Sequence, residues 1–104
     1  MNLTVFPGNP LCGRLALPGD KSLSHRSALL AALADGDSVI GNFLIAGVTR
    51  VLLDALTALG VTWQLDGSTL QISGRGLDGL SPPLQPINCG NSATSLRLLA
   101  GALA

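Results

Sequence analysis

The eight residues GDKSLSHR, at positions 19–26, mark the point where an extended segment is expected to become a helix. They include the only lysine and the only histidine of the chain, together with two serines and one of its arginines. The first backbone N–H groups of a helix have no partner inside the helix, and nearby cations make such a start suitable for phosphate or carboxylate. The stretch therefore predicts an anion site at the start of a helix.

The composition around this stretch is apolar and carries little charge. The 104 residues are 47% hydrophobic and 12% charged, and six basic residues balance six acidic ones, whereas roughly 25% charged residues is usual in a soluble domain. A chain with no net charge has no electrostatic attraction to nucleic acid or to an anionic membrane, so neither is expected as a partner. The length suits one domain.

The cysteines and the N-terminal sequence favour the cytoplasm as the location of the protein. Cys12 and Cys89 lie far apart and fit no metal-binding spacing, so we expect free thiols in a reducing compartment and no metal site. No signal peptide and no long apolar run is present. The sequence stops at Ala104 within an apolar helical pattern, which we interpret as a piece of a longer protein. The alternative is an intact small domain with a frayed last helix.

Hydrophobic periodicity and turn residues predict alternating strands and helices. Asp66-Gly67 is a strong signal for a hairpin between two of the strands. From residue 11 to residue 73 the predicted order is βαβαββ, and a new strand and helix follow a loop rich in Gly and Pro. The predicted elements are strands at 3–6, 11–17, 38–44, 61–65, 70–73 and 87–89, helices at 24–34, 49–59 and 92–104, and the loop at 74–86.

Residues 90–97, GNSATSLR, repeat the pattern of the first stretch. Both copies contain a glycine, small polar residues, a serine and an arginine, and both precede a helix rich in Leu and Ala. The aligned pairs are Gly19 with Gly90, Ser24 with Ser95, and Arg26 with Arg97. A fixed offset of this kind predicts a repeated supersecondary unit.

The side chains of the first start suit the binding of an anion. Lys21 offers a point charge and Arg26 a planar fork, while Asp20 or one of the serines can cap the helix. In the alternative interpretation the serines only cap the helix and Arg26 points into solvent. His25 is a candidate general acid or base, with a capping or helix-surface role as the alternative.

At the second start, the amide of Asn91 can donate to an anion, and three hydroxyl groups follow it. Arg97 is placed like the arginine of the first start; the alternative is that it pairs with Asp54 or Asp78. Neither start has the spacing of a P-loop or of a dinucleotide-binding fingerprint, so no nucleotide cofactor is expected.

The motifs PGDKSLSHR (residues 18–26) and NCGNSATSLRLL (residues 88–99) resemble the 5-enolpyruvylshikimate-3-phosphate synthase family. LDALTALGV (residues 53–61) also suits this family, so the resemblance covers nearly the whole chain. It implies an enzyme that transfers the enolpyruvyl group of phosphoenolpyruvate to the 5-hydroxyl of shikimate 3-phosphate and releases phosphate. The family uses a tetrahedral intermediate and neither metal nor organic cofactor.

The resemblance also implies a fold. It is an α/β fold of the α+β type, an inside-out barrel in two lobes that are each built from three βαβαββ units. Residues 1–104 would form a partial enolpyruvyl transferase domain, with the first unit at residues 11–73 and the start of the next at residues 87–104. The remaining part of the same enzyme would be the partner of this chain.

By this resemblance, three residues of the first start would bind the substrates. Lys21 would be a catalytic residue that contacts phosphoenolpyruvate and balances charge near the reacting centre. Ser22 and Arg26 would hold shikimate 3-phosphate. The family's acid and base carboxylates belong to later sequence, so we expect no turnover by the chain alone. The alternative function is a non-catalytic anion-binding or interaction module that keeps the fold.

At the second start, the resemblance implies a pocket for phosphoenolpyruvate. Asn91 and the backbone around Ala93 would line this pocket, Thr94 would support its helix, and Arg97 would lie behind the binding residues. Many family members have Gly in place of Ala93 and Pro in place of Leu98. The added methyl group of Ala93 implies insensitivity to the inhibitor glyphosate in a complete enzyme.

Overall fold

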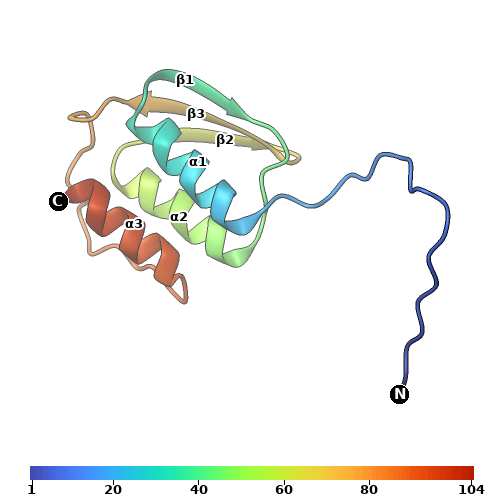
Figure 1. Ribbon diagram of the computed structural model, residues 1–104. Helices are drawn as coiled ribbons and strands as arrows, with labels where there is room; N and C mark the ends of the chain where they lie inside the picture. The colour runs from blue at the N-terminus through green and yellow to red at the C-terminus, as the bar shows by residue number, and fades with distance from the viewer.

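The computed structural model describes residues 1–104 as a small antiparallel sheet covered on one face by helices (Figure 1). The sheet has the strand order β1-β3-β2; α1 and α2 pack on it, and α3 packs on these two helices. This architecture confirms the predicted fold class. The elements are α1 (Lys21–Leu33), β1 (Asp35–Ile40), α2 (Gly47–Ala58), β2 (Thr62–Asp66), β3 (Thr69–Arg75) and α3 (Ala93–Leu103). No helix has both the length and the apolar content needed to cross a membrane.

The hairpin predicted from Asp66-Gly67 is confirmed. β2 and β3 pair antiparallel, and Asp66 lies opposite Thr69, so that only Gly67 and Ser68 form the loop. Gly67 has a φ of 58°, which a two-residue hairpin loop requires at its first position and which glycine adopts without steric cost. The hairpin therefore fixes the register of the two strands.

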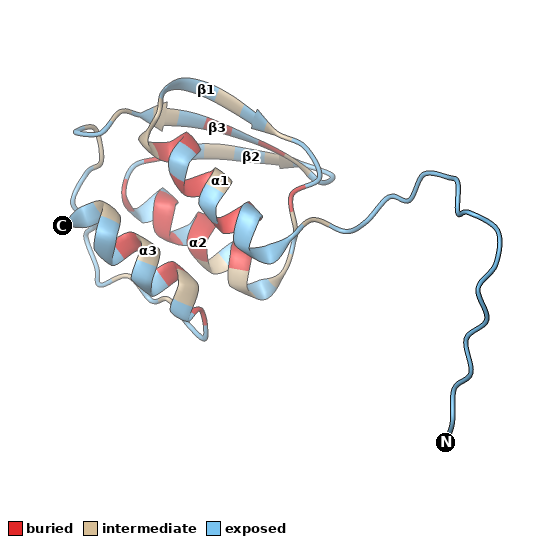
Figure 2. Ribbon diagram, viewed as in Figure 1, coloured by how far each residue is buried: buried red, intermediate tan, exposed pale blue.

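The core lies between the inner face of the sheet and the two helices that cover it (Figure 2). β3 alternates buried and exposed residues, with Leu70 and Ile72 pointing inward and Gln71 pointing outward. The outer face of the sheet is largely polar, so only one face requires cover. The largest apolar side chains that are almost completely buried are Leu52, Leu53, Leu56, Leu59, Leu70 and Ile72.

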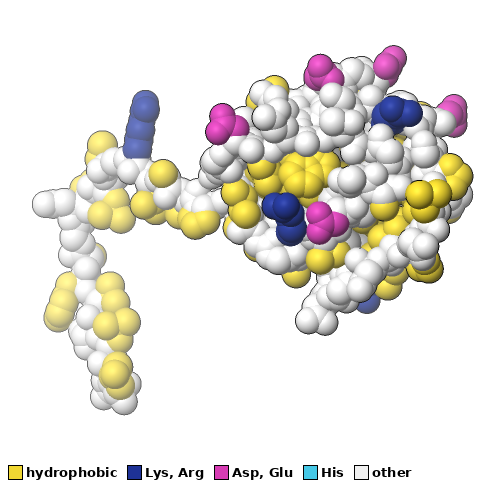
Figure 3. All heavy atoms as spheres, turned by 180° about the vertical axis from the view of Figure 1, so that it is seen from behind, with side chains coloured by type: hydrophobic (Ala, Val, Ile, Leu, Met, Phe, Trp, Pro, Cys, Tyr) yellow, Lys and Arg dark blue, Asp and Glu magenta, His cyan; other side chains and the backbone are white.

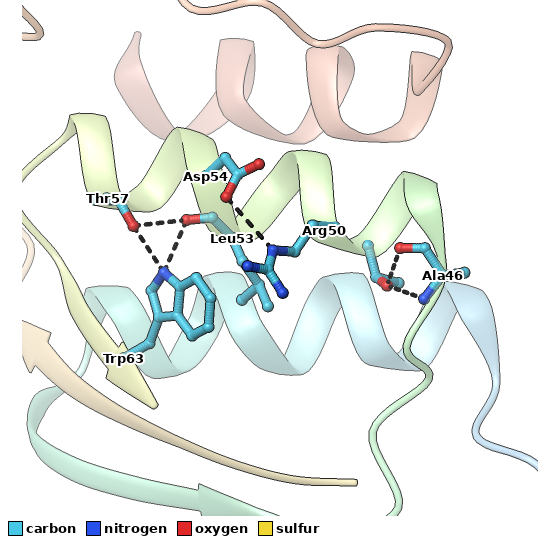
Figure 4. Close-up of polar contacts among 7 residues, drawn as sticks. Ala46, Arg50, Leu53, Asp54, Thr57 and Trp63 are labelled. Carbon is cyan, nitrogen blue, oxygen red and sulfur yellow. Dashed lines mark hydrogen bonds and ion pairs between the residues drawn. The ribbon is translucent and has the colours of Figure 1, made fainter. Parts of the chain in front are cut away.

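The side chain of Trp63 connects β2 to α2 through two hydrogen bonds (Figure 4). Its indole Nε1 donates to the Thr57 hydroxyl at 2.7 Å and to the Leu53 carbonyl at 3.0 Å. The Arg50 guanidinium lies 5.3 Å from the ring centroid and pairs with Asp54 at 3.6 Å. The indole thus has both an apolar contact and a partner for its N–H, as a half-buried tryptophan requires.

β3 approaches the end of α1 very closely at Gly74. A Cβ atom at this position would overlap the carbonyl oxygen of Ala34 and would lie 2.6 Å from that of Ala31. The Gly76 N–H donates to the same Ala34 carbonyl at 2.9 Å. Only glycine fits between the strand and the helix end at this position.

The strands predicted at residues 3–6 and 11–17 are not formed. Residues 1–19 extend from the body as an arm, and none of their N–H groups donates a backbone hydrogen bond (Figure 1). A strand is stabilised by a neighbour that pairs with it, and no segment of this chain pairs with the arm. Its hydrophobic side chains are consequently exposed (Figure 3).

The short strand predicted at residues 87–89 is also wrong. The Asn88 side chain accepts from the Gly90 N–H at 2.8 Å, and the Cys89 carbonyl accepts from the Ser92 N–H at 2.9 Å. These local bonds make a turn and occupy groups that a ladder would need. The other predicted elements are present, with α1 beginning three residues before the predicted position 24 and β1 beginning at Asp35 rather than at residue 38.

Candidate functional site

The three helices run in the same direction, so their N-terminal ends lie at one edge of the molecule (Figure 1). The N-terminal end of a helix carries partial positive charge and unpaired N–H groups. Three such ends at one edge reinforce one another, and both sequence motifs lie on them. This edge is the candidate site.

Asp20 is the cap of α1, as one of the predicted options stated. Its carboxylate accepts from the Leu23 N–H at 2.8 Å. Because the helix starts earlier than predicted, Lys21 and Ser22 lie on its first turn, and both side chains are exposed. Their polar groups make no hydrogen bond within the chain.

The arginines of the two motifs are not neutralised by carboxylates. The one ion pair of the structure joins Arg50 to Asp54 on α2, so Arg26 and Arg97 have no acidic partner. This finding overturns the alternative in which Arg97 pairs with Asp54 or Asp78. Arg26 is exposed one turn into α1 and is available to an anion from solvent.

The start of α3 is capped by Ser92, whose hydroxyl accepts from the Ser95 N–H at 3.1 Å. Asn91 precedes the cap, is exposed and uses its side chain for no internal contact. Ala93 is the first residue of α3 and is exposed, and Thr94 is half-buried. The Asn91 side chain and the surface at Ala93 are therefore open to solvent.

The two helix starts that share a sequence pattern also share a pattern of burial. Ser24 and Ser95 are buried, whereas Arg26 and Arg97 are exposed. The Ser24 hydroxyl accepts from the Leu44 N–H at 3.0 Å, which attaches the segment before α2 to α1. Ser24 thus connects α1 to the segment before α2, Ser95 bonds to the cap of its own helix, and the two arginines face solvent.

His25 is completely buried, so its alternative helix-surface role is wrong. Its Nδ1 lies 2.8 Å from the Lys21 carbonyl oxygen. Its Nε2 lies 3.2 Å from the Val48 carbonyl oxygen and 3.5 Å from the Ser92 hydroxyl. One imidazole therefore touches the N-terminal turns of all three helices. The sequence did not predict this contact, because nothing in the pattern relates Val48 or Ser92 to His25.

Potential ligands for a cation are dispersed over the structure. No three side chains of His, Cys, Asp or Glu come close enough together to hold a metal ion. Cys12 is exposed and Cys89 half-buried, and both thiols are free. Cationic and hydroxyl groups are instead found on the two motif-bearing helix starts, where they suit an anion.

Known proteins are similar to the chain in sequence and in fold. Residues 5–104 match the family described as EPSP synthase (3-phosphoshikimate 1-carboxyvinyltransferase). The 3-phosphoshikimate 1-carboxyvinyltransferase of Geotalea uraniireducens is 46% identical over 97% of this chain and 24% of its own length. That of Geobacter sulfurreducens is 45% identical over 100% of this chain and 24% of its own length. The chain thus spans about a quarter of the curated relatives that it matches.

A solved structure agrees with these sequence matches. An EPSP synthase structure from Acinetobacter baumannii superposes with a TM-score of 0.82 at 38% identity. The superposition covers 88% of this chain and 21% of that one.

Proposed function

The chain belongs to the EPSP synthase family, and from this membership we propose that the complete protein transfers the enolpyruvyl group of phosphoenolpyruvate to the 5-hydroxyl of shikimate 3-phosphate. The hydroxyl oxygen bonds to C2 of the enolpyruvyl group and releases its proton while C3 gains a proton, and the tetrahedral intermediate then loses phosphate from C2 and a proton from C3. One observation carries the part assigned to this chain: motif-bearing helix starts meet at one edge with no carboxylate paired to their cations. The free thiols Cys12 and Cys89 suit a reaction in the cytoplasm.

The first helix start has the groups that two anionic substrates need. Each substrate carries a phosphate and a carboxylate. Arg26 offers two parallel N–H donors to the phosphate of shikimate 3-phosphate, and the Ser22 hydroxyl adds a third. Lys21 has a movable stem, which lets its ammonium group follow the phosphate of phosphoenolpyruvate as charge shifts during addition and elimination.

The second helix start completes the part of the phosphoenolpyruvate pocket that this chain supplies. The exposed amide of Asn91 donates to the substrate, and the backbone at Ala93 lines the pocket. The half-buried Thr94 holds the first turn of α3 against the body. The dipole of α3 adds to that of α1 because the two N-terminal ends lie at the same edge.

Amide NMR of the isolated chain tests whether it carries this part of the site. Titration with shikimate 3-phosphate is expected to shift the amides of residues 21–26, and sodium sulfate at equal ionic strength is the control for unspecific anion effects. The same chain is expected to release no phosphate above background from the two substrates together, since the acid and base carboxylates lie in later sequence. A folded chain whose amides do not respond would contradict the proposed binding. Turnover by the chain would contradict the division of the site.

The alternative function, a non-catalytic anion-binding module, predicts a different result in the complete protein. The module would bind shikimate 3-phosphate but would release no phosphate when joined to its remaining sequence. Turnover that disappears with Lys21→Ala in the complete protein favours the transferase.

Ala93→Gly in the complete enzyme is expected to raise its sensitivity to glyphosate. Ala93 is the exposed first residue of α3, and in the proposed phosphoenolpyruvate pocket its methyl group would narrow the space for an inhibitor. Relief of this overpacking gains about 1–3 kcal/mol in the free energy of inhibitor binding. The inhibitory concentration of glyphosate is then lowered by about 5- to 150-fold. Inhibition curves at fixed phosphoenolpyruvate measure the effect. Ala100→Gly, which lies on an exposed part of the same helix, is the control. Equal shifts in both variants would contradict the role of residue 93.

A further inference from the structure

His25 is the one fully buried titratable side chain of the structure. Its ring contacts groups from three helices: the Lys21 carbonyl in α1, the Val48 carbonyl in α2 and the Ser92 hydroxyl that caps α3. A catalytic acid or base has to reach the substrate, and this ring is fully buried. Its hydrogen-bond partners instead indicate that the ring connects the starts of the three helices.

Each ring nitrogen of His25 lies beside a backbone carbonyl oxygen, and the two contacts differ in length. The Lys21 carbonyl only accepts hydrogen bonds, so the short 2.8 Å contact requires the proton on Nδ1. In a neutral ring, Nε2 then presents a lone pair. The Val48 carbonyl cannot donate to it, whereas the Ser92 hydroxyl can, at 3.5 Å.

The hydroxyl groups of α3 complete this arrangement. Ser92 Oγ accepts from the Ser95 N–H at 3.1 Å and lies 2.7 Å from the Ser95 hydroxyl. The Ser92 hydroxyl either donates to that of Ser95 or, when Ser95 donates to it instead, is free to donate to His25, and both lone pairs of Ser92 are then used. A continuous chain of hydrogen bonds then runs from Ser95 through Ser92 and His25 to the backbone of Lys21.

We infer that His25 is a positioning residue that couples the start of α3 to the start of α1 through its bond to Ser92. It sets the distance between Lys21, on α1, and Asn91, one residue before the cap of α3. The relevance of this distance to phosphoenolpyruvate rests on the function proposed above. The coupling itself depends only on the contacts of the ring.

Two amide variants separate the two ends of the ring. His25→Asn places a side-chain amide near the position of Nδ1 and leaves the Nε2 position empty. His25→Gln extends an amide toward the position of Nε2. If the coupling passes through Nε2, H25N weakens the cap of α3 and H25Q preserves it.

Hydrogen exchange of the Ser95 amide in the ligand-free chain measures this cap. We expect exchange about 5- to 10-fold faster in H25N, the factor that the loss of one hydrogen bond gives, and within about twofold of the unmodified chain in H25Q. The Leu23 amide, which Asp20 caps, is the control and is expected to keep its rate in both variants. Unchanged exchange of Ser95 in a folded H25N, or equal acceleration in both variants, would overturn the inference.

Imidazole NMR provides a second measurement that needs no variant of His25. The ¹⁵N resonances of the unmodified chain are expected to show the proton on Nδ1. Ser92→Ala is expected to move the Nε2 resonance toward its protonated position, because the Val48 carbonyl then faces this nitrogen alone. A proton on Nε2 in the unmodified neutral ring, or an Nε2 resonance that ignores Ser92→Ala, would overturn the inference. Since no ligand is used, failure of the proposed substrate binding leaves these results unaffected.

Discussion

Replacing Arg26 with alanine weakens the binding of shikimate 3-phosphate to this chain by about 10- to 100-fold, as expected for the loss of hydrogen bonds from a charged donor. The guanidinium is exposed and has no carboxylate partner, so its removal leaves no internal group unpaired. The stability of the fold is expected to change by less than about 0.5 kcal/mol for the same reason. Titration followed by amide NMR measures the affinity, and thermal unfolding measures the stability.

Two variants show whether the effect of Arg26→Ala arises from geometry or from charge alone. Arg75→Ala removes the same charge at the opposite end of α1, where the Gly76 N–H meets the Ala34 carbonyl. This variant is expected to bind shikimate 3-phosphate with an affinity within about twofold of the unmodified chain. Salt screens the interaction between charges that are more than about 10 Å apart. Arg26→Lys keeps the charge but loses the fork, and its affinity is expected to be intermediate. Equal losses in the two alanine variants would contradict a specific phosphate contact.

Gly74→Ala is expected to destabilise the fold more than any other substitution considered for this chain. The added Cβ would overlap the Ala34 carbonyl oxygen, a backbone atom that cannot rotate away. β3 and the end of α1 would have to separate, and they enclose the core around Ile72. A cost of about 3 kcal/mol lowers the Tm by roughly 12–24 °C for a domain of this size. Circular dichroism during heating measures the Tm.

The matched control for Gly74→Ala is Gly101→Ala. A Cβ on Gly101, in the last turns of α3, meets no atom within 4 Å. Alanine is favoured over glycine in a helix by about 1 kcal/mol, so this variant is expected to raise the Tm by a few degrees. If the two substitutions changed the Tm equally, the close approach of β3 to α1 would not be needed for stability.

Elements that are determined by residues close together along the chain could be predicted from the sequence. The stripe of leucines in α2 and the Asp66-Gly67 turn each contain their signal within a few residues. The segments at 11–17 and 87–89 have strand-like composition, but a strand depends on a partner elsewhere. The arm meets no such partner, and the Asn88 side chain closes a turn instead. Composition alone therefore overpredicted strands.

The candidate site was predictable in its membership but not in its internal contacts. The exposed position of Arg26 follows from the helical period once the helix start is known, whereas Lys21, one turn before the buried His25, is exposed because it lies at the helix end. The contact between His25 and Ser92 joins residues that are 67 positions apart, and it depends on how α3 packs on α1. Helix packing is decided by many weak contacts and leaves no short signal in the sequence.

The two-residue turn between β2 and β3 has a consequence for the order in which the chain acquires its structure. Its ends are already close in the unfolded chain, so closing this loop costs little entropy, and a hairpin of this kind forms in about 1–10 μs. β1 reaches its place beside β3 only after the chain has closed a far longer loop that includes α2. We expect the β2–β3 hairpin and α2, which lies between β1 and β2 in the sequence, to form the folding nucleus. Because α3 contributes no strand to the sheet, we expect it to pack on α1 and α2 after the slowest step.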